Sequence, residues 1–378
     1  MVPLKHTMST KGCTTLQAVS KSFEVQHEAI RRQVFWLLQR LTSWSLWKAK
    51  QQAFKIFADA YELAIKTDPA NGAEELDANH LTVIYEILAC YDKGLAELGK
   101  GRRFVWRAGQ PLQRAVRQTN VLGDNFYRNP KYWEHGSQFA PYPEKVNALY
   151  QLMRASQFRM DYAPLEVWTD DKIAYLESAD SLLNPARYDH GFYELAYPTI
   201  PEVLPPVPET SGPVIQSGQA VPYDGIWEPV MIERSRVLGV FSTGPKLFEN
   251  EGCFNYLIAD TEAPNLSDVD DNAFGITPRP THWRLLWEDT RYKDGAIPDE
   301  TQYFLKPLGS AHTIEPSAVE PVHTGAICPA SGEWRTDEHG GSTVRVMAGD
   351  RMPDLLVKDS LGERKVHWVR WRLERRID

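Results

Sequence analysis

Residues 324–334 read Thr-Gly-Ala-Ile-Cys-Pro-Ala-Ser-Gly-Glu-Trp, and residues 217–227 read Ser-Gly-Gln-Ala-Val-Pro-Tyr-Asp-Gly-Ile-Trp. Both stretches follow one pattern, a hydroxyl residue and then G-x-x-x-P-x-x-G-x-W. A His-Trp pair follows each stretch, at 282–283 and at 367–368. The C-terminal half is therefore predicted to be a tandem duplication. The shared positions, which we expect to fix backbone shape and to anchor an aromatic side chain, are Gly218, Pro222, Gly225, Trp227, Gly325, Pro329, Gly332 and Trp334.

Length and composition describe a globular protein. The chain has 378 residues, of which 42% are hydrophobic and 24% charged, and this length favours two or three domains. The first thirty residues lack the pattern of a signal peptide, and no apolar run reaches the ~20 residues of a membrane helix. We therefore expect a cytoplasmic protein without a membrane partner. The cysteines, which show no metal or redox spacing and predict neither a metal nor a cofactor, are Cys13, Cys90, Cys253 and Cys328.

Charge is distributed unevenly along the chain. Residues 1–197 contain 24 Lys and Arg against 22 Asp and Glu, whereas residues 198–378 contain 18 against 28. A negative surface repels phosphate and attracts positively charged proteins. The C-terminal half is thus expected to bind a basic protein and not nucleic acid.

The N-terminal half has the apolar spacing of amphipathic helices. A cluster of arginines at 102–117 is interpreted as a solvated helix surface, with a basic binding face as the alternative. Residues 1–197 are predicted to form a helical domain. Its expected helices span 16–41, 46–66, 77–98, 112–122, 144–159 and 170–183.

The character of the chain changes after residue 197. Six prolines between 198 and 213 favour an extended linker, 198–216, with a docking motif for aromatic-groove modules as the alternative. Beyond it, short apolar runs alternate with Gly, Pro, Asn and Asp, which is typical of antiparallel strands. We predict an α+β fold, a helical bundle followed by two small antiparallel modules, module 1 (217–300) and module 2 (301–378).

An acidic segment within module 1 distinguishes the two modules in sequence. When the modules are aligned on their His-Trp pairs, module 1 is longer, and much of the excess falls at 249–271, which contains no Lys or Arg. Uncompensated carboxylates repel one another, so we predict a partner-binding surface here, with a solvated acidic loop as the alternative. Its acidic residues are Glu249, Glu251, Asp260, Glu262, Asp268, Asp270 and Asp271.

No catalytic or ligand-binding motif stands out. Ser331 lacks the preceding glycine of a nucleophile elbow, and Cys328 has no identifiable histidine partner. The equivalent positions expected for His282 and His367 favour packing over catalysis. Residues 268–279 resemble a calcium loop but lack its glycine and its final glutamate. The chain also has no Walker or G-x-G-x-x-G sequence.

Module 2 carries a family resemblance. C-P-x-S-G-x-W at 328–334 and G-D-x-M-P at 349–353 occur in order, and together they resemble the C-terminal signature of immunity families seventy-one and seventy-two of bacterial polymorphic-toxin systems. The resemblance is strong over 324–371, weaker over module 1, and only architectural in the helical half. Its further motif residues, expected to be structural, are Cys328, Gly349, Asp350, Met352 and Pro353.

The resemblance implies a non-enzymatic inhibitor that binds a cognate toxin, often a nuclease. The charge distribution agrees, because a nuclease needs a basic surface for phosphate and an acidic partner is steered toward such a surface. Two alternatives stay open. One is a hydrolase with a site between the helical and β halves, and the other is a chaperone that loads the toxin without blocking it.

Overall fold

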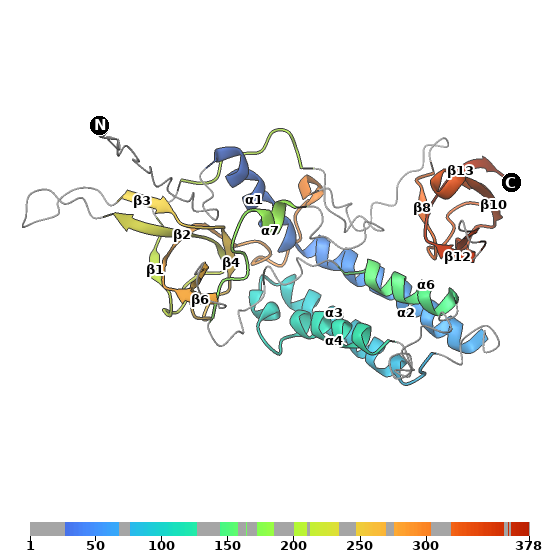
Figure 1. Ribbon diagram of the computed structural model, residues 1–378, viewed down its shortest axis with the longest axis horizontal. Helices are drawn as coiled ribbons and strands as arrows, with labels where there is room; N and C mark the ends of the chain where they lie inside the picture. The colour runs from blue at the N-terminus through green and yellow to red at the C-terminus, as the bar shows by residue number, and fades with distance from the viewer. Residues whose placement is uncertain are drawn as a thin grey trace, which may run out of the picture.

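A computed structural model describes residues 27–67, 76–126, 144–157, 164, 172–184, 200–209, 212–233, 247–269, 276–303, 319–358, 362 and 364–377 (Figure 1). It confirms the α+β class, with helices first and several small antiparallel sheets after them. The helices are α1 (Glu28–Leu41), α2 (Trp44–Thr67), α3 (His80–Leu98), α4 (Pro111–Asp124), α6 (Glu144–Ala155) and α7 (Asp180–Leu183), with the 3-10 turn η3 (Arg103–Trp106) between α3 and α4.

The helices pack around aromatic side chains of α2. Phe54, Phe57 and Tyr61 recur at helical spacing, and all three are 0% exposed. Phe54 meets Tyr91 of α3, and Phe57 meets Phe126 just after α4, with ring centroids 6.1 and 6.3 Å apart. The apolar spacing of the sequence predicted the burial of Phe57 and Tyr61 correctly, whereas Phe54 lay outside the predicted apolar side.

One predicted helix is wrong. Residues 170–183 were expected to be helical, but α7 is the only helix in the described part of this range. Lys172 has a φ of +48°, and Ile173 forms a β-bridge with Asn265. Ala174 and Leu176 are buried while Tyr175 between them is exposed. Alternate burial is the period of a strand and not of a helix. The first two residues of this predicted helix, and the predicted start of the first helix before residue 27, lie outside the described residues.

Module 1 is built on one antiparallel sheet. Its strand order is β1-β7-β2-β3, and β4 also pairs with β2. A separate hairpin, β5 with β6, precedes β7. The strands are β1 (Val214–Gln216), β2 (Gly225–Glu233), β3 (Leu247–Asn250), β4 (Asn255–Leu257), β5 (Leu266–Val269), β6 (Ile276–Arg279) and β7 (His282–Glu288).

Module 2 has the same plan. Its sheet order is β10-β9-β13-β8, and the hairpin β11 with β12 precedes β13. In both sheets the first strand pairs with the last, and the last pairs with the strand that opens at the glycine of the shared pattern. The strands are β8 (Val322–His323), β9 (Gly332–Thr336), β10 (Ser342–Val346), β11 (Leu355–Lys358), β12 (Arg364–His367) and β13 (Arg370–Arg376).

Strand register corrects the alignment of the two modules. Trp227 pairs with Leu285 and Trp334 with Leu373, each beside a register irregularity. The counterpart of Trp283 is therefore Trp371 and not Trp368. His367 ends β12, and its counterpart is Arg279, since these residues pair with Leu355 and Leu266. The predicted equivalence of His282 and His367 is wrong, while the duplication itself stays a prediction.

The two modules relate differently to the helices. Module 1 contributes Ile226, Tyr256 and Leu286 to the helical core, and it has a second core around Trp227. Module 2 has its own core around Trp334 and touches the helical core through Trp368. Figure 1 shows the two sheets at opposite ends of the long axis, with α2 between them.

The proline-rich segment packs onto the protein. Leu204 and Val207 are 8% exposed and belong to the helical core, and Arg32 Nη1 donates to the carbonyl of Leu204 at 3.1 Å. Strand β1 lies within the range predicted as linker, 198–216. The segment therefore contacts α1 and continues into the sheet of module 1. The domain boundaries at 197, 216 and 300 stay predictions.

Candidate functional site

The repeated stretch builds the same turn in both modules. Gly218 and Gly325 have φ of +84° and +81°, a conformation that side chains rarely adopt. The indole of Trp227 donates to the carbonyl of Tyr223, four residues before it, and Trp334 bonds in the same way, both at 3.2 Å. These contacts give the pattern a structural role.

The hydroxyl that opens the pattern links two strands. Thr281 N donates to Ser217 Oγ at 2.9 Å, and Val369 N donates to Thr324 Oγ1 at 3.1 Å. The sequence pattern showed a hydroxyl residue at this position, Ser217 in one module and Thr324 in the other, but it predicted no function for it. Their common property, one oxygen that both accepts and donates, was the signal available.

The G-D-x-M-P stretch also has a counterpart in module 1. Gly349 N donates to the carbonyl of Cys328, and Asp260 N donates to that of Val221, both at 2.9 Å. The φ of Gly349 is +90° and that of Asp260 is +63°. Asp260 and Glu262 therefore lie on a turn that both modules share and not in an insertion. Module 1 is longer instead in the strand that opens at the shared glycine: β2 has 9 residues, whereas its counterpart β9 has 5.

Two members of the acidic segment have cationic partners. Glu251 accepts from Arg279 Nη1 at 3.1 Å and from Thr281 Oγ1 at 2.7 Å. Glu262 forms an ion pair with Lys172. The expectation of uncompensated charge is wrong for these two, because their partners come from outside the segment.

The remaining acidic residues divide into described and undescribed side chains. Glu249 lies on β3 and is exposed, and Asp260 is exposed on its turn. Asp268 lies on β5, but its side chain falls outside the description, as do Asp270 and Asp271. Glu249 and Asp260 are thus the two of these residues that the structure shows to be accessible to a partner.

A buried charge cluster joins the helices to module 1. Asp289 follows β7 and receives Arg103 Nη2, Arg291 Nη2 and the hydroxyl of Tyr256 at 2.8, 2.8 and 2.9 Å. The side chains of Arg103 and Asp289 are completely buried. Arg103 was expected on a solvated surface, so this contact was missed. A lone arginine in a sequence carries no sign of its partner 186 residues away.

The pKa of Asp289 is set by two opposing effects, burial and the hydrogen-bonding partners of its carboxylate. Desolvation raises this pKa, but the two guanidinium groups and the tyrosine hydroxyl outweigh it, and the pKa lies below its ordinary value. Glu228 of β2 behaves alike, because its two cationic partners, Arg31 of α1 and Arg284 of β7, lower its pKa against the effect of burial. Both carboxylates are held ionised and hold the contact between the helices and module 1 together.

The potential nucleophiles make structural contacts. Cys328 is 1% exposed, and its thiol contacts the carbonyl of Ala330 at 3.1 Å. Ser331 Oγ accepts from the backbone N–H of Ala348 at 3.0 Å. The ring of His367 contacts that of His339, with centroids 3.9 Å apart and the planes tilted by 39°. Each of these contacts fixes a turn or a strand end of module 2.

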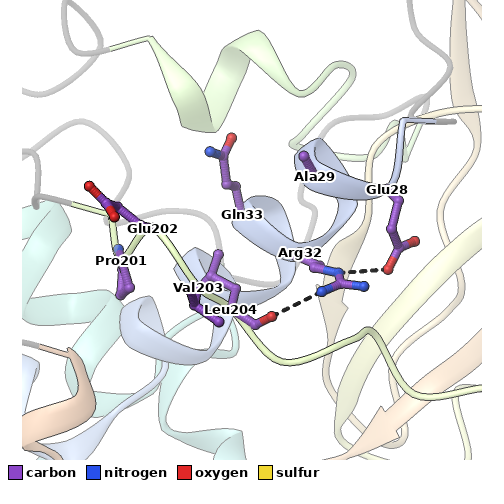
Figure 2. Close-up of a pocket in the computed structure, with 8 residues that line it drawn as sticks. All are labelled: Glu28, Ala29, Arg32, Gln33, Pro201, Glu202, Val203 and Leu204. Atoms are coloured by element: carbon purple, nitrogen blue, oxygen red, sulfur yellow. Dashed lines mark hydrogen bonds and ion pairs between the residues drawn. The ribbon is translucent and has the colours of Figure 1, made fainter.

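A cavity of about 320 Å³ lies between α1 and the proline-rich segment. Figure 2 shows Arg32 in it, with Nε on Glu28 at 2.8 Å and Nη1 on the carbonyl of Leu204. Nη1 of Arg32 thus bonds to the proline-rich segment, while Glu28 of the same helix accepts from Nε. The lining residues are Glu28, Ala29, Arg32, Gln33, Pro201, Glu202, Val203 and Leu204.

A second cavity, of about 340 Å³, lies where module 2 meets α2 and α6. Its charged groups are paired across it: Lys145 with Asp354 at 3.6 Å, and Arg351 with Asp59 at 3.9 Å. The lining residues are Ala60, Leu63, Ala64, Lys145, Leu149, Gly325, Arg351, Met352, Pro353, Asp354 and Trp368.

The described part of the chain offers neither a membrane-spanning helix nor a cluster of metal ligands. None of its helices combines the length and the apolar character needed to cross a bilayer. Within the same residues, no group of three or more His, Cys, Asp or Glu side chains is placed to hold a metal ion.

Comparison with known families identifies the class. Residues 25–179 match the model of Immunity protein 71, and residues 206–305 match that of Immunity protein 72. No curated protein and no solved structure matches the chain. The chain therefore carries Imm71 and Imm72 domains of polymorphic-toxin immunity proteins. Such domains imply neutralisation of a cognate toxin, and their families are typically non-catalytic inhibitors.

The ranges that match the family models differ from the range in which the sequence motifs predicted the resemblance. Residues 324–371, which carry the motifs, lie outside both ranges, whereas the helical half, expected to be similar only in architecture, matches Imm71. The family is thus the expected one, but these matches rest on the helices and on module 1.

Proposed function

We propose that this chain is a cytoplasmic immunity protein that binds a cognate nuclease toxin of the type VI secretion system and blocks it without turnover. The observation that carries the proposal is the charge of module 1. Residues 217–300, which lie within the Imm72 match, contain 15 Asp and Glu against 7 Lys and Arg, whereas residues 301–378 contain 11 of each. The acidity of the C-terminal half thus belongs to module 1.

Charge complementarity gives the proposed mechanism. A nuclease presents cations to the phosphate backbone, and a surface of opposite sign speeds association with it, most strongly at low salt. The proposed contact surface comprises Glu249, Glu251, Asp260, Glu262, Asp268, Asp270 and Asp271 of module 1. Within the families, we propose a relation to TsiT, the inhibitor of the type VI nuclease effector TseT, on the basis of the motifs at 328–334 and 349–353. This proposed relation motivates the nuclease part of the proposal.

Co-expression tests the function directly. The probe is the mature toxin encoded by the neighbouring reading frame, produced in the same cytoplasm with or without the chain. Restored growth with purified 1:1 binding supports an inhibitor. Binding without rescue indicates a loading chaperone, and a chain that hydrolyses a substrate in a general hydrolase screen contradicts the proposal.

Association kinetics test the acidic surface. Replacing Glu249 by Gln and Asp260 by Asn removes two exposed charges, and Asn tolerates the positive φ at position 260. The combined change of Asp268, Asp270 and Asp271 to Asn removes three more. We expect slower association by stopped flow at low salt and a weaker dependence on salt concentration.

A matched control separates local from total charge. Glu86 of α3 and Asp124 of α4 are also exposed, so Glu86→Gln with Asp124→Asn changes net charge by the same amount on the helical half. Equal slowing by both pairs would assign the effect to net charge alone. Unchanged kinetics in the module 1 variants at low salt would refute the proposed surface.

The hydrolase alternative finds little support at the contact between the helices and module 1. Ile226, Tyr256 and Leu286 fill the described part of that contact together with the helical core. The charged groups there, Asp289 and Arg103, are fully buried and bonded to each other. These contacts favour a joint that is closed to substrates.

A further inference from the structure

Module 1 holds an extended segment that comes from the helical half. Asn265 N donates to the carbonyl of Lys172, and Ala174 N donates to the carbonyl of Asn265, both at 2.8 Å. These bonds form a parallel bridge between Ile173 and Asn265. Ala174 lies in the core of module 1, and Leu176 lies in the helical core. The segment thus adds to the module by backbone pairing with alternate side chains buried.

The corresponding place in module 2 has the same backbone. Asn265 follows Pro264, and Asp354 follows Pro353, at the start of the hairpins β5 with β6 and β11 with β12. Within the described part of the chain, the backbone N–H and C=O of Asp354 take part in no hydrogen bond. Backbone groups of this kind ordinarily find a partner in protein or water.

The cavity of about 340 Å³ lies at that position. Asp354 and Pro353 line one side, and Ala60, Leu63 and Leu149 of the helices line the other. A water occupies ~30 Å³ of liquid, so the space is large enough for side chains and backbone. The apolar helix wall suits a segment that buries alternate side chains.

Charge specifies the occupant. In module 1, Glu262 forms an ion pair with Lys172 of the bound segment. The counterpart of Glu262 is Arg351, since the two residues occupy the same bridge position, with Ala220 and Ile327 as their partners. Arg351 lies 3.9 Å from Asp59 of α2, and a guanidinium has donors enough for a second carboxylate. An extended segment in module 2 is therefore expected to carry an acidic side chain where module 1 has Lys172.

We propose that this cavity binds an extended segment of the partner toxin, paired with the backbone of Asp354 and carrying an acidic residue beside Arg351. This inference rests on the proposed function and names a second contact, at the opposite end of the molecule from the acidic surface of module 1. Strand addition of this type derives affinity from main-chain bonds and specificity from alternate side chains.

Peptide titration of the full-length protein tests the groove without the toxin. The probe is a labelled peptide copying residues 170–177 with Lys172→Glu, and the matched control is the unchanged peptide. Fluorescence anisotropy is expected to show tighter binding of the Lys172→Glu peptide by roughly fivefold, the equivalent of one exposed ion pair. Equal affinities of the two peptides would overturn the charge argument.

Two variants of the protein locate the binding. Ala60→Trp fills the cavity, whereas Ala89→Trp places the same side chain on an exposed position of α3. We expect Ala60→Trp to abolish peptide binding and Ala89→Trp to leave it unchanged. Thermal unfolding of both variants checks that module 2 stays folded. Binding that survives Ala60→Trp would refute the groove.

A charge exchange completes the test. Arg351→Glu introduces the residue that module 1 carries at the corresponding position, so the turn accommodates it. The variant is expected to prefer the unchanged, lysine-containing peptide. If wild-type protein rescues growth but binds neither peptide, the groove proposal fails and the proposed function stands. If rescue fails as well, the proposed function fails.

Discussion

The two modules share one sheet plan, but the outer faces of their sheets meet different surroundings. In module 1, Ile226 lies in register between Tyr256 and Trp287, and these apolar side chains face the helical core. In module 2, the corresponding position is Glu333, which lies between Arg345 and Arg375. The turns thus set the backbone, and the residues of the outer face decide whether a module joins the helices.

This difference has an energetic consequence. Module 1 shares apolar burial and two buried charge clusters with the helices, whereas module 2 relies on a separate core and on exposed ion pairs such as Arg375 with Glu333 at 2.9 Å. Exposed pairs contribute little to stability. We therefore expect the helices and module 1 to unfold together and module 2 to unfold on its own.

The largest effect is expected from removing the buried indoles. Trp227→Ala and Trp334→Ala each delete a side chain that is 0% exposed, at a cost of about 3–5 kcal/mol. Trp227→Ala should lower the stability of the helices, because its module is coupled to them. Trp334→Ala should unfold module 2 alone. Hydrogen exchange of α2 and β9 distinguishes these outcomes. Equal destabilisation of the helices by the two variants would contradict the different coupling of the two modules to the helices.

A somewhat smaller effect is expected from the buried charge cluster. Asp289→Asn leaves Arg103 and Arg291 without their carboxylate, and breaking a buried pair in this way costs about 3 kcal/mol or more. Urea unfolding followed by circular dichroism of the helices measures the loss. The control, Glu288→Gln, breaks the neighbouring exposed pair with Lys293 and should cost under about 1 kcal/mol. Equal losses would contradict the proposed coupling.

The smallest effect is expected from exchanging residues of the shared turn. Asp260 and Gly349 occupy the same left-handed position. Asp260→Gly should be close to neutral, and Gly349→Asp should cost about 1 kcal/mol, since acidic residues tolerate this conformation. Thermal unfolding of the two variants measures both. A loss above ~3 kcal/mol in either would show that the two turns are not equivalent.

Periodicity and turn residues were sufficient to predict much of the fold. The helices at 46–66 and 112–122 and the sheets opening at Gly225 and Gly332 follow from local pattern. The segment 172–177 was missed because its strand period is short and competes with good helix formers. The alignment of the modules was wrong because it matched Trp283 with Trp368, the tryptophans of the two His-Trp pairs. Strand pairing instead makes Trp371 the counterpart of Trp283.

Less of the candidate site could be predicted. Composition located the acidic segment, but the partners of Glu251 and Glu262 lie far away in the sequence, and only the fold brings Arg279 and Lys172 to them. The Arg103 cluster was invisible for the same reason. Long-range pairing between single charges leaves no periodic trace in a sequence.

The segment held by module 1 bears on how such proteins are inherited and engineered. Ala174 and Leu176 belong to the range that matches Imm71, yet they complete cores to which the Imm72 range contributes. A cut between the two family ranges would leave an exposed apolar slot on one fragment and an unpaired strand on the other. We therefore expect the two domains to be exchangeable only as a single unit, and chimaeras between relatives should be joined after module 1 and not within it.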